Sequence, residues 1–410
     1  MEAGVLILKS KKYRKTKQKM EKINKNNNEI IHTETGICID CFKAFGIKEE
    51  KYGVALIVND MPCETAVVFT KNTAKAAPVL VNIGKLNAGS RFQAVIVNSG
   101  NANCCTKTGI ADANEMCEIA SGKLNINPDK ILVASTGIIG KKLDVDKIRQ
   151  IVNKINVSES NSKSLDAAKA IMTTDTVPKE ISIEYKGIKI GGIIKGVGMI
   201  APNVATMLCF LSTNAGFGKE KLQSALKIAV NDSFNMLVID DMSTNDTVIL
   251  MSNGKFKCNS DDFQYALNYA CIELAKKLAF DGEGATKFFE VTVRGAKSKD
   301  DARKGARAVV SSYLVKSAIF GENPNWGRIA GALGTVIEFD FQKTDVVFES
   351  GNKSYYVVTK GEIMDLKPAA EILKNREIKV TVDSNSGSES ATAYGCDLSY
   401  GYVKINAEYN

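Results

Sequence analysis

Short apolar runs alternate along the chain with polar turns and with longer stretches in which apolar residues recur at helical spacing. A short apolar run bounded by turn residues is typical of a buried strand, and helical spacing is typical of an amphipathic helix. Strands interleaved with helices indicate a mixed α/β or α+β architecture around a buried sheet layer. The pattern predicts strands at 52–58, 67–70, 92–98, 131–134, within 181–194 and beyond 346, and helices from 109 and at 220–234, 266–278 and 306–320.

The stretch Lys195–Ala215 departs from this regular pattern. Two glycines and a proline, at positions 196, 198 and 202, precede the apolar run Met207–Leu211. Glycine permits unusual backbone angles, and proline fixes φ and removes a donor. A tight loop would therefore deliver Ala205 and Thr206 to the edge of a buried element. The Thr206 hydroxyl is then either a satisfied polar group in a buried strand or a nucleophile on a rigid support.

Thr206 as a nucleophile requires a base. The single histidine, His32, lies in a polar N-terminal segment, which disfavours a Ser-His or Cys-His mechanism. A threonine can instead use its own α-amine, whose pKa of about 7.7–8.0 lies near neutral pH. An internal threonine acquires that amine only when the preceding bond is cut. This interpretation therefore requires scission between Ala205 and Thr206.

The net charge of +8 is concentrated at the N-terminus. Residues 1–25 hold nine Lys or Arg against two Glu, so the rest of the chain is nearly neutral. Residues 1–35 are predicted to be a disordered basic tail. A neutral body disfavours nucleic acid as a partner, although an RNA or membrane contact through the tail stays open. No apolar run approaches the roughly 18 residues of a membrane helix, so no membrane association of the body is expected.

Ten cysteines could form disulfides in a secreted protein. The early apolar patch precedes the basic residues, which is the reverse of a secretory signal, so a cytoplasmic protein with reduced thiols is expected. The pairs Cys38/Cys41 and Cys104/Cys105 lack a second pair at zinc spacing. They are interpreted as structural, with a metal or redox role as the alternative.

Several polar turns could be ordinary turns or ligand contacts. Ser135-Thr136-Gly137 follows a predicted strand, where free backbone N–H groups and a hydroxyl could face a ligand. Thr173–Thr176 has the composition of a cap or loop. Lys195 is most simply a solvated lysine, Glu283 a turn residue between two glycines, and Trp326 a packing anchor in a loop.

The central stretch KGVGMIAPNVATML resembles the KGSGMIAPNMATML motif of the ornithine acetyltransferase family, also called the arginine biosynthesis bifunctional protein or glutamate N-acetyltransferase family. Further segments resemble that family in order, among them VNSGNAN, STG, TTDT, STNDT and DGEGATK. The resemblance runs from about Gly36 to Asn410. It implies an α-β-β-α sandwich of the DmpA/ornithine acetyltransferase type. It also implies self-cleavage into an α chain (36–205 after the tail) and a β chain (206–410), assembled as α2β2.

The resemblance also implies roles for single residues. Thr206 would be the acetyl-carrying nucleophile, and Thr136 with Gly137 would form the oxyanion hole. The implied substrate-binding residues are Thr173, Lys195, Thr206, Glu283 and Asn406. Two positions depart from the pattern: Val238–Met242 lacks a glycine, and a ligand expected five residues after Asn406 would fall beyond Asn410.

The implied reaction is acetyl transfer from N2-acetyl-L-ornithine to L-glutamate in arginine biosynthesis, without a metal or organic cofactor. Some family members also accept acetyl-CoA as donor. Two alternatives remain at this point. One is a self-cleaving aminopeptidase or amidase of similar fold, which would hydrolyse peptides. The other is a binding protein without catalytic activity, which would not cut itself.

Overall fold

The structure, a computed structural model, describes residues 29–89, 91–198, 207–239 and 243–408. Within these residues nine strands form one sheet in the order β1-β6-β7-β8-β10-β3-β4-β5, with β2 paired to β3. Their bounds are β1 (Ile31–His32), β2 (Phe42–Glu49), β3 (Tyr52–Phe69), β4 (Arg91–Asn101), β5 (Ile131–Ile138), β6 (Lys179–Tyr185), β7 (Ile188–Lys195), β8 (Leu208–Ala215) and β10 (Thr247–Phe256).

This sheet folds over on itself, because the long strand β3 belongs to two layers. The first half of β3 pairs with β2 and β4, and its second half pairs with β10. Side chains alternate along each strand. Leu132 and Ala134 of β5 therefore face inward and share one buried cluster with Ile249 and Met251 of β10. An apolar core thus separates a β2-β3-β4-β5 layer from a β6-β7-β8-β10 layer.

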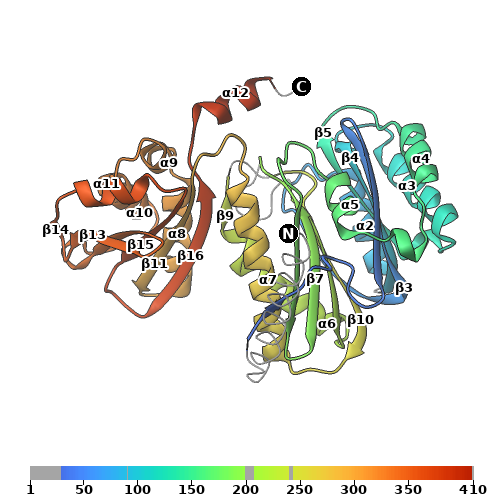
Figure 1. The fold of residues 1–410 in the computed structure, drawn as a ribbon, viewed down its shortest axis with the longest axis horizontal. Helices are drawn as coiled ribbons and strands as arrows, with labels where there is room; N and C mark the ends of the chain where they lie inside the picture. The colour runs from blue at the N-terminus through green and yellow to red at the C-terminus, as the bar shows by residue number, and fades with distance from the viewer. Residues whose placement is uncertain (1–28, 90, 199–206, 240–242, 409–410) are drawn as a thin grey trace, which may run out of the picture.

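Helices cover both outer faces (Figure 1). Helices α3 (Gly109–Leu124) and α4 (Val145–Lys154) pack on the alternate residues of β3, β4 and β5. On the other side, α6 (Lys219–Asp232) and α7 (Ser260–Phe280) pack on β7, β8 and β10. The predicted α-β-β-α sandwich is therefore confirmed. Two further helices, α2 (Ala77–Ala88) and α5 (Ser164–Ala170), pack against β5 and against β2 and β3.

A second sheet forms a separate lobe, at the left of Figure 1. In the described residues its order is β14-β13-β12-β15-β11-β16-β9. Helix α7 contacts β6 and β7 of the sandwich and also β16, so one apolar core joins the lobes. The bounds are β9 (Leu237–Val238), β11 (Phe288–Ala296), β12 (Asp345–Ser350), β13 (Lys353–Thr359), β14 (Glu362–Ile363), β15 (Glu377–Asp383), β16 (Glu389–Cys396), α8 (Lys299–Ser311), α9 (Tyr313–Phe320), α10 (Trp326–Gly334), α11 (Lys367–Leu373) and α12 (Tyr400–Glu408), with 3-10 turns η1 (Pro128–Lys130), η2 (Glu159–Asn161), η3 (Phe234–Met236) and η4 (Phe341–Lys343).

Four elements differ from the sequence prediction. Residues 135–137, predicted as a turn after the strand at 131–134, belong to β5, which continues to Ile138. The strands expected at 52–58 and 67–70 are one strand, β3, whose register with β4 shifts between Val58 and Cys63. The helix expected at 306–320 is divided at Ser312, whose hydroxyl accepts from the Val315 N–H and begins a new helix. The expected loop around Trp326 begins α10, and the indole stacks on Phe341 as a packing anchor.

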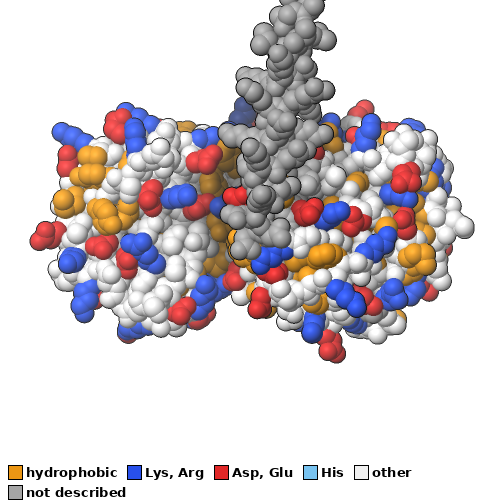
Figure 2. Space-filling model, turned by 60° about the horizontal axis from the view of Figure 1, so that its bottom comes forward, with side chains coloured by type: hydrophobic (Ala, Val, Ile, Leu, Met, Phe, Trp, Pro, Cys, Tyr) orange, Lys and Arg blue, Asp and Glu red, His pale blue; other side chains and the backbone are white. Residues whose placement is uncertain are grey.

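The last residues of the segment predicted as a tail are part of the sheet. Ile31 and His32 pair with β6, and the Thr33 N–H donates to the Ser182 carbonyl. The ordered body therefore begins before residue 35. Lys/Arg and Asp/Glu side chains are interspersed over the face shown in Figure 2, consistent with the nearly neutral body. No helix of the described residues combines the length and apolarity that crossing a membrane requires.

Candidate active site

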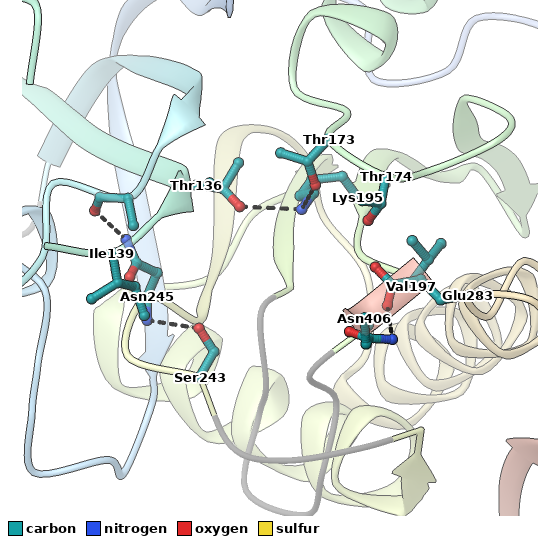
Figure 3. A pocket seen from close by; sticks show the side chains of 13 residues that line it. Thr136, Ile139, Thr173, Thr174, Lys195, Val197, Ser243, Asn245, Glu283 and Asn406 are labelled. Carbon is teal, nitrogen blue, oxygen red and sulfur yellow. Dashed lines mark hydrogen bonds between the residues drawn. The ribbon is translucent and has the colours of Figure 1, made fainter. Parts of the chain in front are cut away.

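A pocket opens at one end of the sandwich, where β5 and β7 end and β8 and β10 begin (Figure 3). Its volume is about 110 Å³. Thr136, Gly137, Thr173, Lys195, Glu283 and Asn406, six of the residues predicted for the site, line it together. The other lining residues are Ala102, Ile139, Thr174, Val197, Gly198, Ser243 and Asn245. The strand ends bring Thr136, Lys195 and Asn245 together, and the segment after α7 and helix α12 add Glu283 and Asn406.

Thr136 and Lys195 face each other across the two sheet layers. Thr136 continues the inward-facing series of Leu132 and Ala134, and Lys195 follows the inward-facing Ile193. The Lys195 ammonium donates to the Thr136 hydroxyl at 3.1 Å and to the Thr173 hydroxyl at 2.7 Å. Lys195 is 1% exposed, so the expectation of a solvated lysine is wrong.

The direction of these hydrogen bonds leaves two hydroxyl protons for a ligand. An ammonium only donates, whereas a threonine hydroxyl has one donor proton and two acceptor positions. Thr136 and Thr173 must therefore accept from Lys195. Within the described residues, the contacts of these hydroxyls leave their O–H protons free to point into the pocket.

Asp175 holds the floor of the pocket in place. Its carboxylate accepts from the Gly196 N–H at 2.8 Å, from the Thr173 N–H at 3.1 Å and from the Lys179 ammonium at 2.8 Å. Its Oδ2 lies 4.0 Å from Lys195 Nζ. Burial acts to raise the pKa of Asp175, but the two lysines and the Gly196 N–H outweigh it, and the pKa lies below its usual value. The sequence predicted Thr173 and missed this carboxylate two residues later.

Lys195 and Lys48 are both attracted by the Asp175 carboxylate. Burial lowers the pKa of Lys195, and Asp175 opposes that change. Behind it, Lys48 donates to the Met172 carbonyl at 2.5 Å and to the Ser99 hydroxyl at 2.9 Å. Burial, followed by repulsion from Lys195, lowers the pKa of Lys48 to about 8. The floor of the pocket is therefore cationic and suited to a carboxylate ligand.

Gly137 occupies a position that requires glycine. Its φ of +132° lies outside the range that other residues readily adopt. A Cβ atom would also stand 2.4 Å from the Gly100 carbonyl carbon. The β4–β5 pairing is irregular at this point, between Gly100 and Asn101. The end of β5 is therefore irregular at the position where a backbone N–H could face a ligand.

Glu283 and Asn406 form the opposite wall. Glu283 follows α7, and its N–H donates to the Val197 carbonyl at 2.9 Å. The Asn406 amide, on α12, donates to Glu283 Oε2 at 3.0 Å and to the Tyr402 carbonyl at 3.1 Å. Gly198 packs so closely that a Cβ there would stand 2.4–2.6 Å from the Glu283 carboxylate atoms. A carboxylate and an amide thus face the cationic floor.

Asn245 joins the pocket wall to the strand ends. Its side-chain amide donates to the Ala102 carbonyl at 2.6 Å and to the Ser135 carbonyl at 2.8 Å, and its N–H donates to the Ser243 hydroxyl at 3.2 Å. Asn245 therefore holds the end of β5 that carries Thr136. The resemblance of residues 243–247 to the family motif STNDT located this segment. The pattern of apolar and polar residues gave no reason to select Asn245 within it.

Asp246 is fully buried beside the start of β8. Its Oδ1 accepts from the Met207 N–H at 2.9 Å, and its Oδ2 accepts no hydrogen bond from the described residues. Burial raises the pKa of Asp246 well above its usual value, although the Met207 N–H and Lys195 act to lower it. The buried Asp246 carboxyl thus holds the backbone of the residue that follows Thr206.

Some predicted positions lie outside the described residues. They are Ala205 and Thr206, the segment 240–242 that departs from the family pattern, and Asn410. In the described part of the chain, no group of three or more His, Cys, Asp or Glu side chains could hold a metal ion. The described pocket offers hydroxyl donors, a cation and a carboxylate, which together suit an amino acid with both charges.

The chain is similar to known acetyltransferases along most of its length. A glutamate N-acetyltransferase of Methanocaldococcus jannaschii is 46% identical, over 90% of this chain and 96% of that protein. The structure of the arginine biosynthesis bifunctional protein ArgJ from Bacillus halodurans is 37% identical, covering 49% of this chain and 98% of that chain, with a TM-score of 0.46. The ornithine acetyltransferase of Mycobacterium tuberculosis, solved with ornithine, is 34% identical over 42% of this chain and 98% of that chain, with a TM-score of 0.38. A profile of the ArgJ family matches residues 41–410, and the chain therefore belongs to that family.

Proposed function

We propose that this protein is a glutamate N-acetyltransferase that moves the acetyl group of N2-acetyl-L-ornithine to L-glutamate in arginine biosynthesis. The observation that carries the proposal is the pocket itself. Hydroxyl donors, the buried Lys195 and the Glu283–Asn406 pair surround it, next to the start of the strand that follows Thr206. Membership of the ArgJ family and the name of the relative that is 46% identical support the same activity.

The nucleophile in this proposal is Thr206, released by cleavage after Ala205 to give chains 1–205 and 206–410. The sheet explains how the two chains would stay together. Lys195 at the end of β7 pairs with Leu208 at the start of β8, and β10 also pairs with β3. Both products would thus retain their places in one sheet. A pair of such units would form the α2β2 assembly.

In the transfer step, the Thr206 hydroxyl attacks the acetyl carbonyl carbon of N2-acetyl-L-ornithine, and its proton passes to the Thr206 amine. The negative charge that develops on the acetyl oxygen is stabilised by the Thr136 hydroxyl and the Gly137 N–H. Each such donor is typically worth a factor of about 10²–10³ in rate. The C–N bond then breaks, and the departing ornithine nitrogen takes the proton from the amine.

The second half-reaction reverses these roles. The amine of L-glutamate attacks the acetyl-Thr206 ester, its proton passes to the Thr206 amine and on to the leaving threonine oxygen, and N-acetyl-L-glutamate departs. Lys195, with Thr173, would bind the α-carboxylate common to both substrates. Glu283, with Asn406, would bind the side-chain ammonium of ornithine. This chemistry needs no metal or organic cofactor.

Intact-mass measurement tests the proposal directly. Purified protein should contain chains of 1–205 and 206–410, and N2-acetyl-L-ornithine alone should add one acetyl group to the second chain. Adding L-glutamate should remove that group and yield N-acetyl-L-glutamate. Acetyl-CoA replaces acetylornithine in a parallel assay, which decides whether it serves as a second donor.

Variants at position 206 provide the control. Thr206→Ala should remain a single chain and carry no acetyl group, whereas Thr206→Ser should still cleave. Thr335→Ala, which alters an exposed threonine, should behave like the unmodified protein. A single uncleaved chain with full activity would contradict the mechanism. Peptide hydrolysis without transfer to glutamate would instead identify an aminopeptidase or amidase.

A further inference from the structure

Two adjacent cysteines lie in the turn after β4, and the proposed reaction does not use them. Cys104 is 1% exposed, whereas Cys105 is exposed to solvent. Their sulfur atoms lie 3.5 Å apart, and all ten cysteines of the chain are free thiols in the described residues. Cys105 has a φ of +57°, a left-handed conformation that holds its side chain beside that of Cys104. The turn therefore holds a closely spaced dithiol in which Cys105 is exposed and Cys104 lies directly beneath it.

A disulfide between these thiols would be strained. Adjacent Cα atoms across a trans peptide are about 3.8 Å apart, whereas disulfides usually join Cα atoms about 4.4–6.8 Å apart. Strained disulfides are the easily reduced ones. The pair is therefore expected to remain a dithiol under reducing conditions, so it stays available to other reactants.

We propose that Cys104 and Cys105 form a binding site for a soft electrophile of the trivalent-arsenic class, which bridges both sulfurs through one atom. Soft ligands such as thiolates select soft centres. A structural zinc ion would need four ligands, and no third His, Cys, Asp or Glu completes a site in the described residues. Two sulfurs 3.5 Å apart instead match a centre that takes only two protein ligands.

The exposed thiol reacts first. Cys105 is exposed and Cys104 is buried, so Cys105 is the more accessible nucleophile. Burial also raises the pKa of the Cys104 thiol. With an arylarsine oxide, Cys105 forms the first As–S bond, and Cys104 then closes the ring. Two As–S bonds form, the As–O bonds break, and the two thiol protons leave with the oxide oxygen as water. No electron transfer is involved. Because the second step occurs within one turn, its effective concentration is high.

The dithiol turn is hydrogen-bonded to two walls of the pocket. The Gly140 N–H donates to the Cys104 carbonyl at 3.0 Å, and the Ala102 N–H donates to the Ile138 carbonyl at 3.0 Å. The Ala102 carbonyl accepts from the Asn245 side chain. Ala102, Ile139 and Asn245 all line the pocket. The sulfurs already lie at a bridging separation, so the bound group itself, and not a movement of Cys104, would stand beside this wall. We expect it to disturb the wall and the adjoining end of β5, which carries Gly137.

Intact mass after treatment with phenylarsine oxide tests the binding site without reference to catalysis. The full protein should gain one phenylarsenic unit per chain at a stoichiometric dose. Dithiothreitol should remove it, whereas a monothiol should not. Cys104→Ser and Cys105→Ser should each abolish this adduct, and the control Cys38→Ser/Cys41→Ser should keep it. Cys209 and Cys271, which are both buried, should not react in the native protein. An equal adduct in Cys105→Ser would overturn the proposal.

Inhibition is the second readout, and it rests on the proposed transferase activity. Phenylarsine oxide should reduce acetyl transfer by about tenfold or more in the unmodified protein. Phenylarsine oxide should leave the transfer rate of Cys105→Ser equal to the rate of the same variant without treatment. A stoichiometric adduct with unchanged transfer would overturn the coupling to the pocket. Absence of transfer in untreated protein would contradict the proposed function, and the mass measurement would still decide the binding site.

Discussion

At the scale of single residues, buried ionisable groups are concentrated beside the pocket. Asp175, Lys179, Lys195 and Asp246 are all nearly inaccessible to solvent. Removing charges from water is unfavourable unless they are paired or neutralised. Asp175 is paired with Lys179, whereas Asp246 has no cationic partner within ion-pair distance among the described residues. Asp175 is thus stabilised as a carboxylate by pairing, whereas burial without a cationic partner raises the pKa of Asp246.

Substitution of Asp246 should therefore change the pH dependence of stability. An unfolded aspartate ionises near pH 3.9, whereas burial raises the pKa of Asp246 in the native protein, so the native state holds this proton to higher pH. Above pH 3.9 the unfolded state thus binds fewer protons, and stability falls as pH rises toward the native pKa. Relative to Asp246→Asn, the loss should be about 1.4 kcal/mol per pH unit.

The measurement is urea unfolding between pH 4 and 8, with every protein carrying Thr206→Ala so that it unfolds as one chain. Asp129→Asn, at an exposed aspartate, is the matched control. Its free energy of unfolding should depend on pH in the same way as that of its parent. Parallel curves for Asp246→Asn and its parent would show that Asp246 is ionised in the native protein.

The residues of the pocket were predictable to different degrees. The resemblance of STG to the family motif selected Thr136, which its local pattern alone left as an ordinary turn residue. Inward alternation from Leu132 indicates the direction of its side chain. The resemblance placed Lys195 in the site, whereas the residue alone suggested a solvated lysine. Its burial depends on β5 in the other sheet layer, and the local sequence does not specify that packing. Asn245 was missed for the same reason, since its contacts at Ala102 and Ser135 are more than 100 positions away.

At the scale of elements, the end of β7 and the end of α7 meet at Gly198 and Glu283. Gly198→Ala should displace the Glu283 carboxylate, because the new methyl group would overlap it. Since that carboxylate is the flexible end of a side chain, the fold should tolerate the shift. The expected result is a rise of about tenfold in KM for acetylornithine, equivalent to about 1.4 kcal/mol, with kcat changed less.

Steady-state kinetics and thermal unfolding check this prediction together. Gly122→Ala, in α3 with no neighbour within 4 Å of the added Cβ, is the control and should leave both measurements near the parent values. A KM equal to that of the parent would mean that Glu283 does not contact the substrate.

Elements were predictable where local pattern and tertiary packing agree. The helix from Gly109 matches α3, and the strand at 131–134 is the first half of β5. The long β3 was divided in the prediction because Asn59, Asp60 and Pro62 have the composition of a turn. Its continuity comes from pairing with β4 and β10, which lie far along the chain.

At the scale of the whole molecule, the N-terminal segment divides into two parts that deletion should separate. Removal of residues 1–28 should leave the melting temperature and transfer activity near those of the full chain. Removal of 1–35 should lower the melting temperature by several degrees, because it also deletes β1 and the Thr33 contact with Ser182. Calorimetry of both truncations checks this. Loss of activity on removing 1–28 would show that the basic segment contributes to the enzyme.

The pairing of β7 with β8 has a consequence for assembly kinetics. In the uncut chain, the paired residues Lys195 and Leu208 are only 13 positions apart, so β7 and β8 can pair within one molecule. After cleavage, the same pairing would join two separate chains. Refolding of the cleaved protein from denaturant should then be second order and slow at low protein concentration. Thr206→Ala should refold at a rate independent of concentration. Stopped-flow and manual-mixing experiments over a hundredfold concentration range would separate the two cases. Folding before cleavage would thus be unimolecular. After cleavage, a protein that unfolds could regain its native state only when two separate chains meet.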